Sequence, residues 1–204
     1  YLFGGRLVDP GVDIVSFYAD QFPDGDMARE VARRFGVPLF DSIEKAMCVG
    51  GDSLAVDAVL SIGEHGNYPV NDLGQKMYPR KRFFDAAVAV MKHANRFVPL
   101  FNDKHFSFRW DWAREMVDVA RANRMPLMAG SSVPLAQRRP VMDLPRGTKI
   151  TEAIAVHGGQ LESYGFHGLE VLQSMIESRG ENGETGIARV QVLEGDALFE
   201  AARQ

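Results

Sequence analysis

Short apolar runs alternate with amphipathic stretches along the first two thirds of this chain. Four of these runs carry the β-branched and aromatic side chains of buried strands: they are Val12–Tyr18, Val56–Ile62, Val98–Phe101 and Pro126–Ala129. Four stretches between them have helical character: they are Asp26–Phe35, a short helix that begins near Asp41 or Ser42, Arg82–Ala94 and Trp110–Ala122. Strands and helices that alternate at this spacing predict βαβ units and a parallel sheet.

The spacing of apolar residues also predicts which side of each helix faces the core. The expected inner faces are Met27, Val31 and Phe35 in the first helix, Phe83, Phe84, Ala87, Val88 and Met91 in the third, and Trp112, Met116, Val119 and Ala120 in the fourth. Gly36 follows the first of these helices, where a left-handed residue commonly ends a helix. We therefore expect that helix to stop at Gly36.

The alternation is interrupted at Ser131–Gly147, a segment with three prolines that is predicted to be an exposed crossover. The elements predicted beyond it are a strand at Lys149–Val156, a helix at Leu161–Ser178, a polar turn at Gly180–Gly186, a strand at Ile187–Leu193 and a final short helix. The sequence thus predicts an α/β fold, with a Rossmann-like parallel sheet in residues 1–134, a linker in 135–148 and a smaller α+β part in 149–204.

Composition narrows the classes of function. Among 204 residues with a net charge of -4, Cys48 is the only cysteine, which excludes a disulfide framework and a cysteine-based zinc ribbon. No basic cluster is longer than Arg80–Arg82, and no apolar run approaches the length of a membrane span. We expect a cytoplasmic protein that acts on a small molecule, with no nucleic-acid or membrane partner, and that can form a homo-oligomer. Because the chain begins with Tyr1 rather than methionine, we also expect a segment to precede it.

Polar side chains follow the predicted strands, and ligands of open parallel sheets bind beyond the carboxyl ends of the strands. The candidates, in chain order, are Asp20, then Glu64 and His65, then Asp103, Lys104 and His105. A further cluster at the start of a later helix contains Glu162, Tyr164 and His167. Asp20 could accept hydrogen bonds from ribose hydroxyls and Lys104 could move a proton. Structural roles, such as a turn carboxylate or a half-buried histidine, are the alternative for each.

The segment VDAVLSIGEHGNYP and three others together resemble the Gfo/Idh/MocA oxidoreductases, in which this segment is similar to a strand and its following loop. VDIVSFYADQFPDGDMAREVARRFGVPLFDSIEKAM is similar to the second Rossmann strand and helix of that family, and VPLFNDKHFSFRWDWAREMVDVARANRMPLMAGSSVP to its Glu-Lys-Pro segment. GGQLESYGFHGLEVL is similar to a helix start that carries a histidine at the substrate. The resemblance spans residues 12–134 and 150–172 and implies an enzyme that oxidises or reduces a sugar or polyol with NAD or NADP.

The resemblance implies a role for each candidate. Lys104 is the implied catalytic lysine, with Asp103 in place of the glutamate of the family, and His167 is the implied acid/base residue. Asp20 falls at the ribose carboxylate. Glu64 and His65 are assigned to the cofactor, and His105, Tyr164 and Glu162 to the substrate.

The chain also departs from the family pattern. It contains no GxGxxG motif, Glu64-His65 replaces Pro-Asn, and His105 replaces the proline after the lysine. The Gly-rich turn would normally hold the cofactor pyrophosphate. We therefore expect the protein with a complete nucleotide-binding unit to bind NAD(H), and residues 1–204 alone to bind it far more weakly.

Two other functions remain open from the sequence. The carboxylates and imidazoles at the predicted strand ends and loops suit a divalent metal, which would give a metal-dependent sugar hydrolase, lyase or isomerase. No HExxH motif or histidine pair at i and i+4 supports a metal site. The missing glycine turn instead favours a Rossmann-like binding module without catalytic activity.

Overall fold

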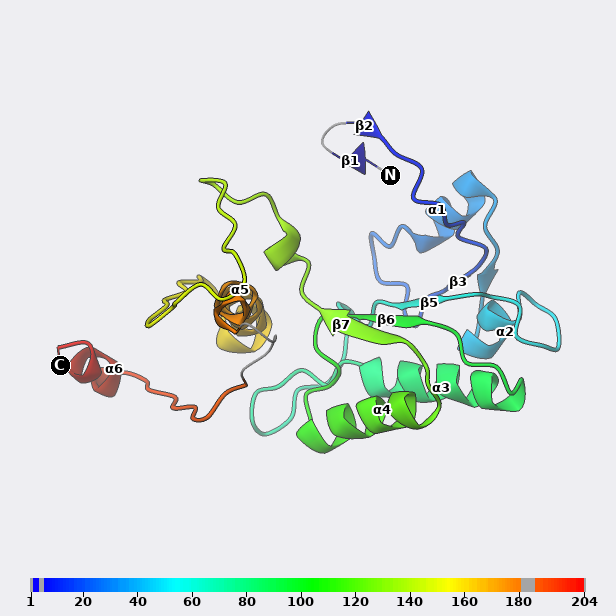
Figure 1. The fold of residues 1–204 in the computed structure, drawn as a ribbon. Coiled ribbons are helices and arrows are strands. Elements are labelled where there is room, and N and C mark those ends of the chain that lie inside the picture. The colour runs from blue at the N-terminus through cyan, green and yellow to red at the C-terminus, as the bar shows by residue number, and fades with distance from the viewer. Residues whose placement is uncertain (1, 4–5, 181–185, 204) are drawn as a thin grey trace. The chain divides into compact units, whose positions relative to one another are not determined.

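The computed structural model describes residues 2–3, 6–180 and 186–203 of a mixed α/β protein. This part of the chain contains six α-helices and two small parallel sheets (Figure 1). It divides into two compact units. The first consists of Tyr1–Ser132 and Gly159–Phe166, and the second of Val133–Gly158 and His167–Gln204.

Both parallel sheets belong to the first unit. Strand β3 (Phe17–Tyr18) pairs with β4 (Leu39–Phe40), and β5 (Val59–Ser61), β6 (Leu100–Asp103) and β7 (Leu127–Gly130) form a three-stranded sheet in that order. A separate antiparallel pair, β1 (Leu2–Phe3) with β2 (Arg6–Leu7), precedes them. The predicted parallel pairing of strands that alternate with helices is confirmed. The carboxyl ends of β5 and β6 therefore meet at one edge.

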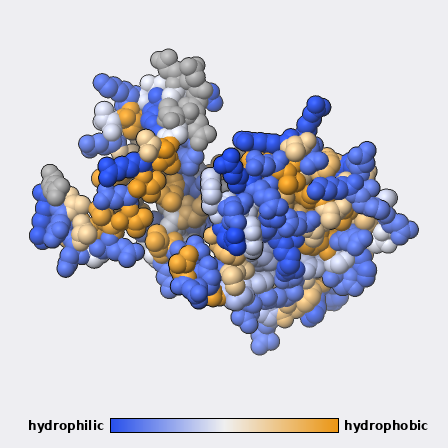
Figure 2. All heavy atoms as spheres, turned by 90° about the horizontal axis from the view of Figure 1, so that it is seen from below, coloured by the Kyte–Doolittle hydropathy of each residue, from blue (hydrophilic) through white to orange (hydrophobic). Residues whose placement is uncertain are grey.

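Helices α3 (Arg80–His93) and α4 (Trp110–Ala122) cover one face of the three-stranded sheet (Figure 1). Phe84, Met91, Leu100 and Met116 are almost fully buried in the core between them. The inner faces predicted for these two helices are confirmed, since every residue assigned to those faces is buried or half-buried. The face of the first unit seen in Figure 2 is mostly hydrophilic.

The two remaining helices of this unit are shorter. Helix α1 (Ala28–Phe35) ends at Gly36, whose φ of 66° is left-handed, as predicted. Helix α2 (Ile43–Met47) begins after Ser42, whose side chain accepts a hydrogen bond from the Lys45 amide at 3.1 Å. The predicted inner face of α1 is wrong at Met27 and Phe35, which are each 68% exposed, whereas Val31 is half-buried and the buried residue is the small Ala32. This eight-residue helix packs mainly through its small residues and Val31, which leaves the longer side chains at its two ends in solvent.

Replacing Gly36 by alanine is expected to destabilise the first unit by about 1 kcal/mol, since an L-residue is strained in the left-handed region. No atom lies within 4 Å of the added methyl group, so strain rather than a clash is the expected cause. Urea unfolding followed by tryptophan fluorescence measures it, because both tryptophans, Trp110 and Trp112, lie in α4. Gly36→Asn should lose less stability, as asparagine tolerates this conformation better; equal losses would contradict the explanation.

The second unit differs most from the prediction. Its described helices are α5 (Phe166–Ile176), which begins at the boundary between the units, and α6 (Asp196–Ala201), with short turns at Val133–Leu135 and Glu177–Arg179. A π-helical turn at Leu161–Gly165, assigned to the first unit, begins the predicted 161–178 helix. Of the predicted turn at residues 180–186, positions 181–185 lie outside the described residues.

Neither predicted strand of the C-terminal part is present as a strand in residues 149–156 or 187–193, which the structure describes in full. Both segments have the residue types of strands, but neither has a neighbouring strand with which to exchange backbone hydrogen bonds. Their apolar side chains are largely exposed, as Ile154 and Val156 show at 89% and 93%. Hydrophobic side chains accordingly gather on the surface of this unit (Figure 2). The predicted strands Val12–Tyr18 and Val56–Ile62 are shorter than expected, at two and three residues, for the same reason.

Candidate functional site

A lysine and two carboxylates form the densest ionic cluster at the carboxyl ends of β5 and β6. The Lys104 Nζ atom lies 2.8 Å from Glu64 Oε2 and 2.8 Å from Asp103 Oδ2. All three side chains are about one-fifth exposed or less. Glu64 follows β5 and Lys104 follows β6, so parallel pairing of these strands brings together residues forty positions apart in the chain.

The carboxylates keep the lysine charged. Burial by itself would lower the pKa of Lys104, but hydrogen bonds from its ammonium to Asp103 and Glu64 outweigh burial and raise the pKa above its ordinary value. Burial would likewise raise the pKa of Asp103, but hydrogen bonds with Lys104 and Glu64 hold that pKa below its ordinary value. The cluster therefore holds a charged ammonium group in ion pairs with Glu64 and Asp103.

The backbone at Lys104 is in an unusual conformation. Its φ of 68° is left-handed, which is uncommon outside glycine. The Lys104 N–H donates to the Gly130 carbonyl at 3.1 Å, and the Gly130 N–H donates to the Lys104 carbonyl at 3.1 Å. This reciprocal bridge to β7 fixes the turn that carries the lysine. Strained backbone of this kind is often found at functional sites.

Two buried polar residues near the cluster, Arg80 and Asn102, were not among the candidate site residues. Arg80 is 2% exposed, lies with its Nη1 3.2 Å from His105 Nε2, and stacks on the Tyr78 ring at 4.7 Å. Its stem packs closely against Gly63, where an added Cβ would lie 3.0 Å from Arg80 Cγ. Asn102, the next-to-last residue of strand β6, is fully buried. The available signal for Asn102 was its place as the first of the four polar residues Asn102–His105 at the end of this strand.

Asp20 forms a second network at the carboxyl end of β3. One carboxylate oxygen accepts from the Tyr18 hydroxyl at 2.7 Å, and the other accepts from the Tyr68 hydroxyl at 2.9 Å and from Arg82 Nη2 at 2.6 Å. Burial would raise the pKa of Asp20, but these three donors hold it below its ordinary value. The side chain of Gln21 adds two hydrogen bonds to the backbone of Asn67. The loop after β5 is thus tied to the end of β3.

The Tyr68 hydroxyl is expected to ionise unusually late. Burial, followed by its hydrogen bond to Asp20, raises the pKa of Tyr68 from 10.0 to about 12. The neutral hydroxyl therefore stabilises the folded chain fully below pH 10, and this stabilisation is lost as the pH rises towards about 12. Urea unfolding should show a larger alkaline loss of stability in the wild type than in Tyr68→Phe, which keeps only the losses from other groups such as Tyr18. In Asp20→Asn, ultraviolet titration should show Tyr68 ionising earlier; an unchanged titration would contradict the role of Asp20.

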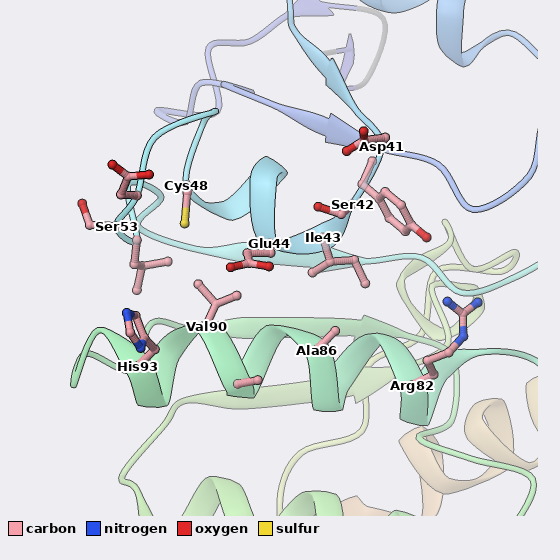
Figure 3. Close-up of a pocket in the computed structure, with 14 residues that line it drawn as sticks. Asp41, Ser42, Ile43, Glu44, Cys48, Ser53, Arg82, Ala86, Val90 and His93 are labelled. Atoms are coloured by element: carbon pink, nitrogen blue, oxygen red, sulfur yellow. The ribbon is translucent and has the colours of Figure 1, made fainter.

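A groove lies between α2 and α3, with a volume of about 490 Å³ (Figure 3). Ile43, Ala86 and Val90 give it an apolar surface, and Tyr18 and Arg82 lie at the end next to the Asp20 network. Its dimensions are those of a small-molecule site. None of the three residues of the Lys104 cluster lines it.

The remaining candidates lie elsewhere. His65 is exposed and left-handed, with a φ of 61°. His105 packs edge-on against Phe166, with ring centroids 5.0 Å apart. Glu162 and Tyr164 lie on the π-helical turn, and His167 belongs to the second unit, where its ring stacks on His157 with centroids 6.4 Å apart. The structure brings Glu64 to Lys104 and Asp103, and the functional roles assigned to all of these residues stay predictions.

In the part of the chain that the structure describes, no three histidine, cysteine, aspartate or glutamate side chains gather in a way that could hold a metal ion. Among the same residues, no helix has both the length and the apolar character needed to cross a bilayer. No family model, curated protein or solved structure matches this chain.

Proposed function

We propose that this chain is part of an NAD(P)-dependent oxidoreductase, with a Rossmann-like sheet, that acts on a sugar or polyol. The observation that carries the proposal is the Lys104 ammonium, held 2.8 Å from both Glu64 and Asp103 at the carboxyl ends of two parallel strands. Ligands of open α/β sheets bind at this edge. A lysine with two carboxylate neighbours suits proton exchange with a hydroxyl or carbonyl oxygen.

In this proposal the chain handles the proton of the reaction. A bound nicotinamide supplies the hydride exchange at the substrate carbon. When the substrate hydroxyl is oxidised, Lys104 passes one of its protons to Glu64 or Asp103 and takes up the hydroxyl proton. In the reverse direction the carboxylic acid returns that proton and Lys104 protonates the substrate oxygen. His105, Glu162 and Tyr164 are proposed to contact the substrate, and His167 to act as a second acid/base group.

The Asp20 network fits the adenosine half of such a cofactor. The carboxylate can accept about four hydrogen bonds and has three, so it has one position left for a ribose hydroxyl. Arg82 is half-exposed and could meet the extra phosphate of NADP. The groove beside Tyr18 and Arg82 offers an apolar surface for the base. Glu64 contacts Lys104, so we place it in proton transfer rather than at the cofactor.

Calorimetric titration with NADH and with NADPH tests this proposal. We expect weak but measurable binding of at least one of them by residues 1–204, weakened further in Asp20→Asn and unaffected in Asp24→Asn, which alters an exposed carboxylate of the same loop. The same preparations are then assayed for nucleotide-dependent oxidation of a panel of sugars and polyols. If neither nucleotide releases heat with the wild type, the oxidoreductase proposal is wrong.

A further inference from the structure

We infer that Asn102 is a positioning residue, which holds the turn after β6 in the form that places Lys104 between Glu64 and Asp103. The inference concerns the placement of the lysine. Only its consequence for turnover rests on the proposed function.

The contacts of Asn102 are directed at the backbone of this turn. Its side-chain Nδ2 lies 3.3 Å from the Asp103 carbonyl, 3.4 Å from the Lys104 carbonyl and 3.1 Å from the His105 carbonyl. Three successive carbonyl oxygens thus converge on one amide group. Oxygens gathered in this way repel one another unless a donor lies between them, and the two N–H groups of Asn102 supply that donor.

The chemistry of the position requires an amide. Asn102 is 0% exposed, so water has no access to replace its hydrogen bonds. In the part of the chain that the structure describes, its Oδ1 accepts no hydrogen bond. All the polar contacts of the side chain are therefore donated to the turn. An aspartate would place a buried negative charge against the three carbonyls, and a leucine would fill the space without donating.

The geometry of the turn explains why such a donor is needed. Lys104 is left-handed, with a φ of 68°, and this conformation costs free energy for a residue with a side chain. The bridge to Gly130 holds the turn from the outside, and Asn102 holds it from within the core. Without the amide, we expect Lys104 to relax towards ordinary backbone angles, which would draw its Nζ away from Glu64.

The placement of Lys104 can be measured without substrate or cofactor. Trace acetylation with isotopically labelled acetic anhydride, followed by mass spectrometry, compares the reactivity of Lys104 with that of the exposed Lys92 in the same molecule. In the wild type Lys104 should react slowly, because its two carboxylate neighbours keep it protonated and partly covered. In Asn102→Ser and Asn102→Leu its reactivity relative to Lys92 should rise severalfold.

Ser61→Ala provides the matched control. Ser61 is the partner of Asn102 in the β5–β6 register and is also buried. Within the described residues its Oγ neither donates nor accepts a hydrogen bond. Removing this hydroxyl disturbs the same layer of the core but leaves the Lys104 turn intact. The ratio of Lys104 to Lys92 labelling should therefore stay at the wild-type value. A rise in Ser61→Ala equal to that in Asn102→Ser, or no rise in either Asn102 variant, would overturn the inference.

A measurement on the unaltered chain covers the case in which neither Asn102 variant folds. The side-chain amide protons of Asn102 should exchange with solvent slowly in nuclear magnetic resonance spectra, as expected for a fully buried donor. Fast exchange in the folded wild type would overturn the inference whatever the variants do. If placement is confirmed but no nucleotide binds, Asn102 keeps its positioning role and only the proposed function fails.

Discussion

Lys104→Met is expected to lower turnover by about 10²–10⁴-fold, the usual contribution of a positioned acid/base group. Methionine keeps much of the volume of the side chain but cannot carry a proton between the substrate oxygen and the carboxylates of Glu64 and Asp103. Initial rates with the substrate identified in the sugar and polyol panel measure the effect. Nucleotide binding should change little, because Lys104 does not line the groove beside Asp20.

Lys92→Met is the control for this prediction. Lys92 lies in the last turn of α3 and is exposed, so its replacement removes one positive charge without touching the cluster. We expect wild-type turnover. Equal turnover in Lys104→Met and Lys92→Met would show that Lys104 is not the acid/base group, whereas a wild type that turns over no substrate of the panel would favour a binding module over an enzyme.

Phe84→Ala is expected to cost the first unit about 3–5 kcal/mol of unfolding free energy, as large-to-small changes in a packed core do. Phe84 is 1% exposed and lies in the core that α3, α4 and the three-stranded sheet enclose. The expected cost has two parts: the favourable free energy of burying the aromatic ring is lost, and a cavity remains in its place. Urea unfolding followed by tryptophan fluorescence reports on α4, which lies in the same unit.

Phe35→Ala tests whether burial is the cause. It removes the same side chain from a position that is 68% exposed, at the end of α1. We expect a change within about 0.5 kcal/mol, the usual range for surface substitutions. A loss at Phe35 comparable to that at Phe84 would show that the helix α1 packs more extensively than the structure indicates.

Local patterns were sufficient to predict the framework of the first unit. The periodicity of apolar residues placed Phe84 and Met91 on the inner face of α3 and Met116 on that of α4, because a helix repeats every 3.6 residues and its long buried faces leave a regular trace. The same pattern gave the wrong inner face for α1. In a helix of eight residues, tertiary packing on Ala32 decides which side is buried, and periodicity carries little information.

The strand predictions in the C-terminal part show the corresponding limit for sheets. Residues 149–156 and 187–193 have the composition of strands, but a strand exists only where a neighbour completes its hydrogen bonds. Composition describes one segment at a time and does not supply that neighbour. The segments β5, β6 and β7 do form strands, because each pairs in register with a neighbour.

The sequence alone determined that Glu64, Asp103 and Lys104 lie at or just beyond the ends of strands, where polar side chains gather. Tertiary structure alone decided their pairing, since Glu64 reaches Lys104 only through the register of β5 with β6. It also decided that Asp20 is bound by Tyr68 and Arg82, which lie 48 and 62 positions away. The period of apolar residues predicts which residues of a long helix are buried, because the side chains on one side of the helix all face the core. The partner of a charged side chain depends on how distant segments pack, and no local pattern records that choice.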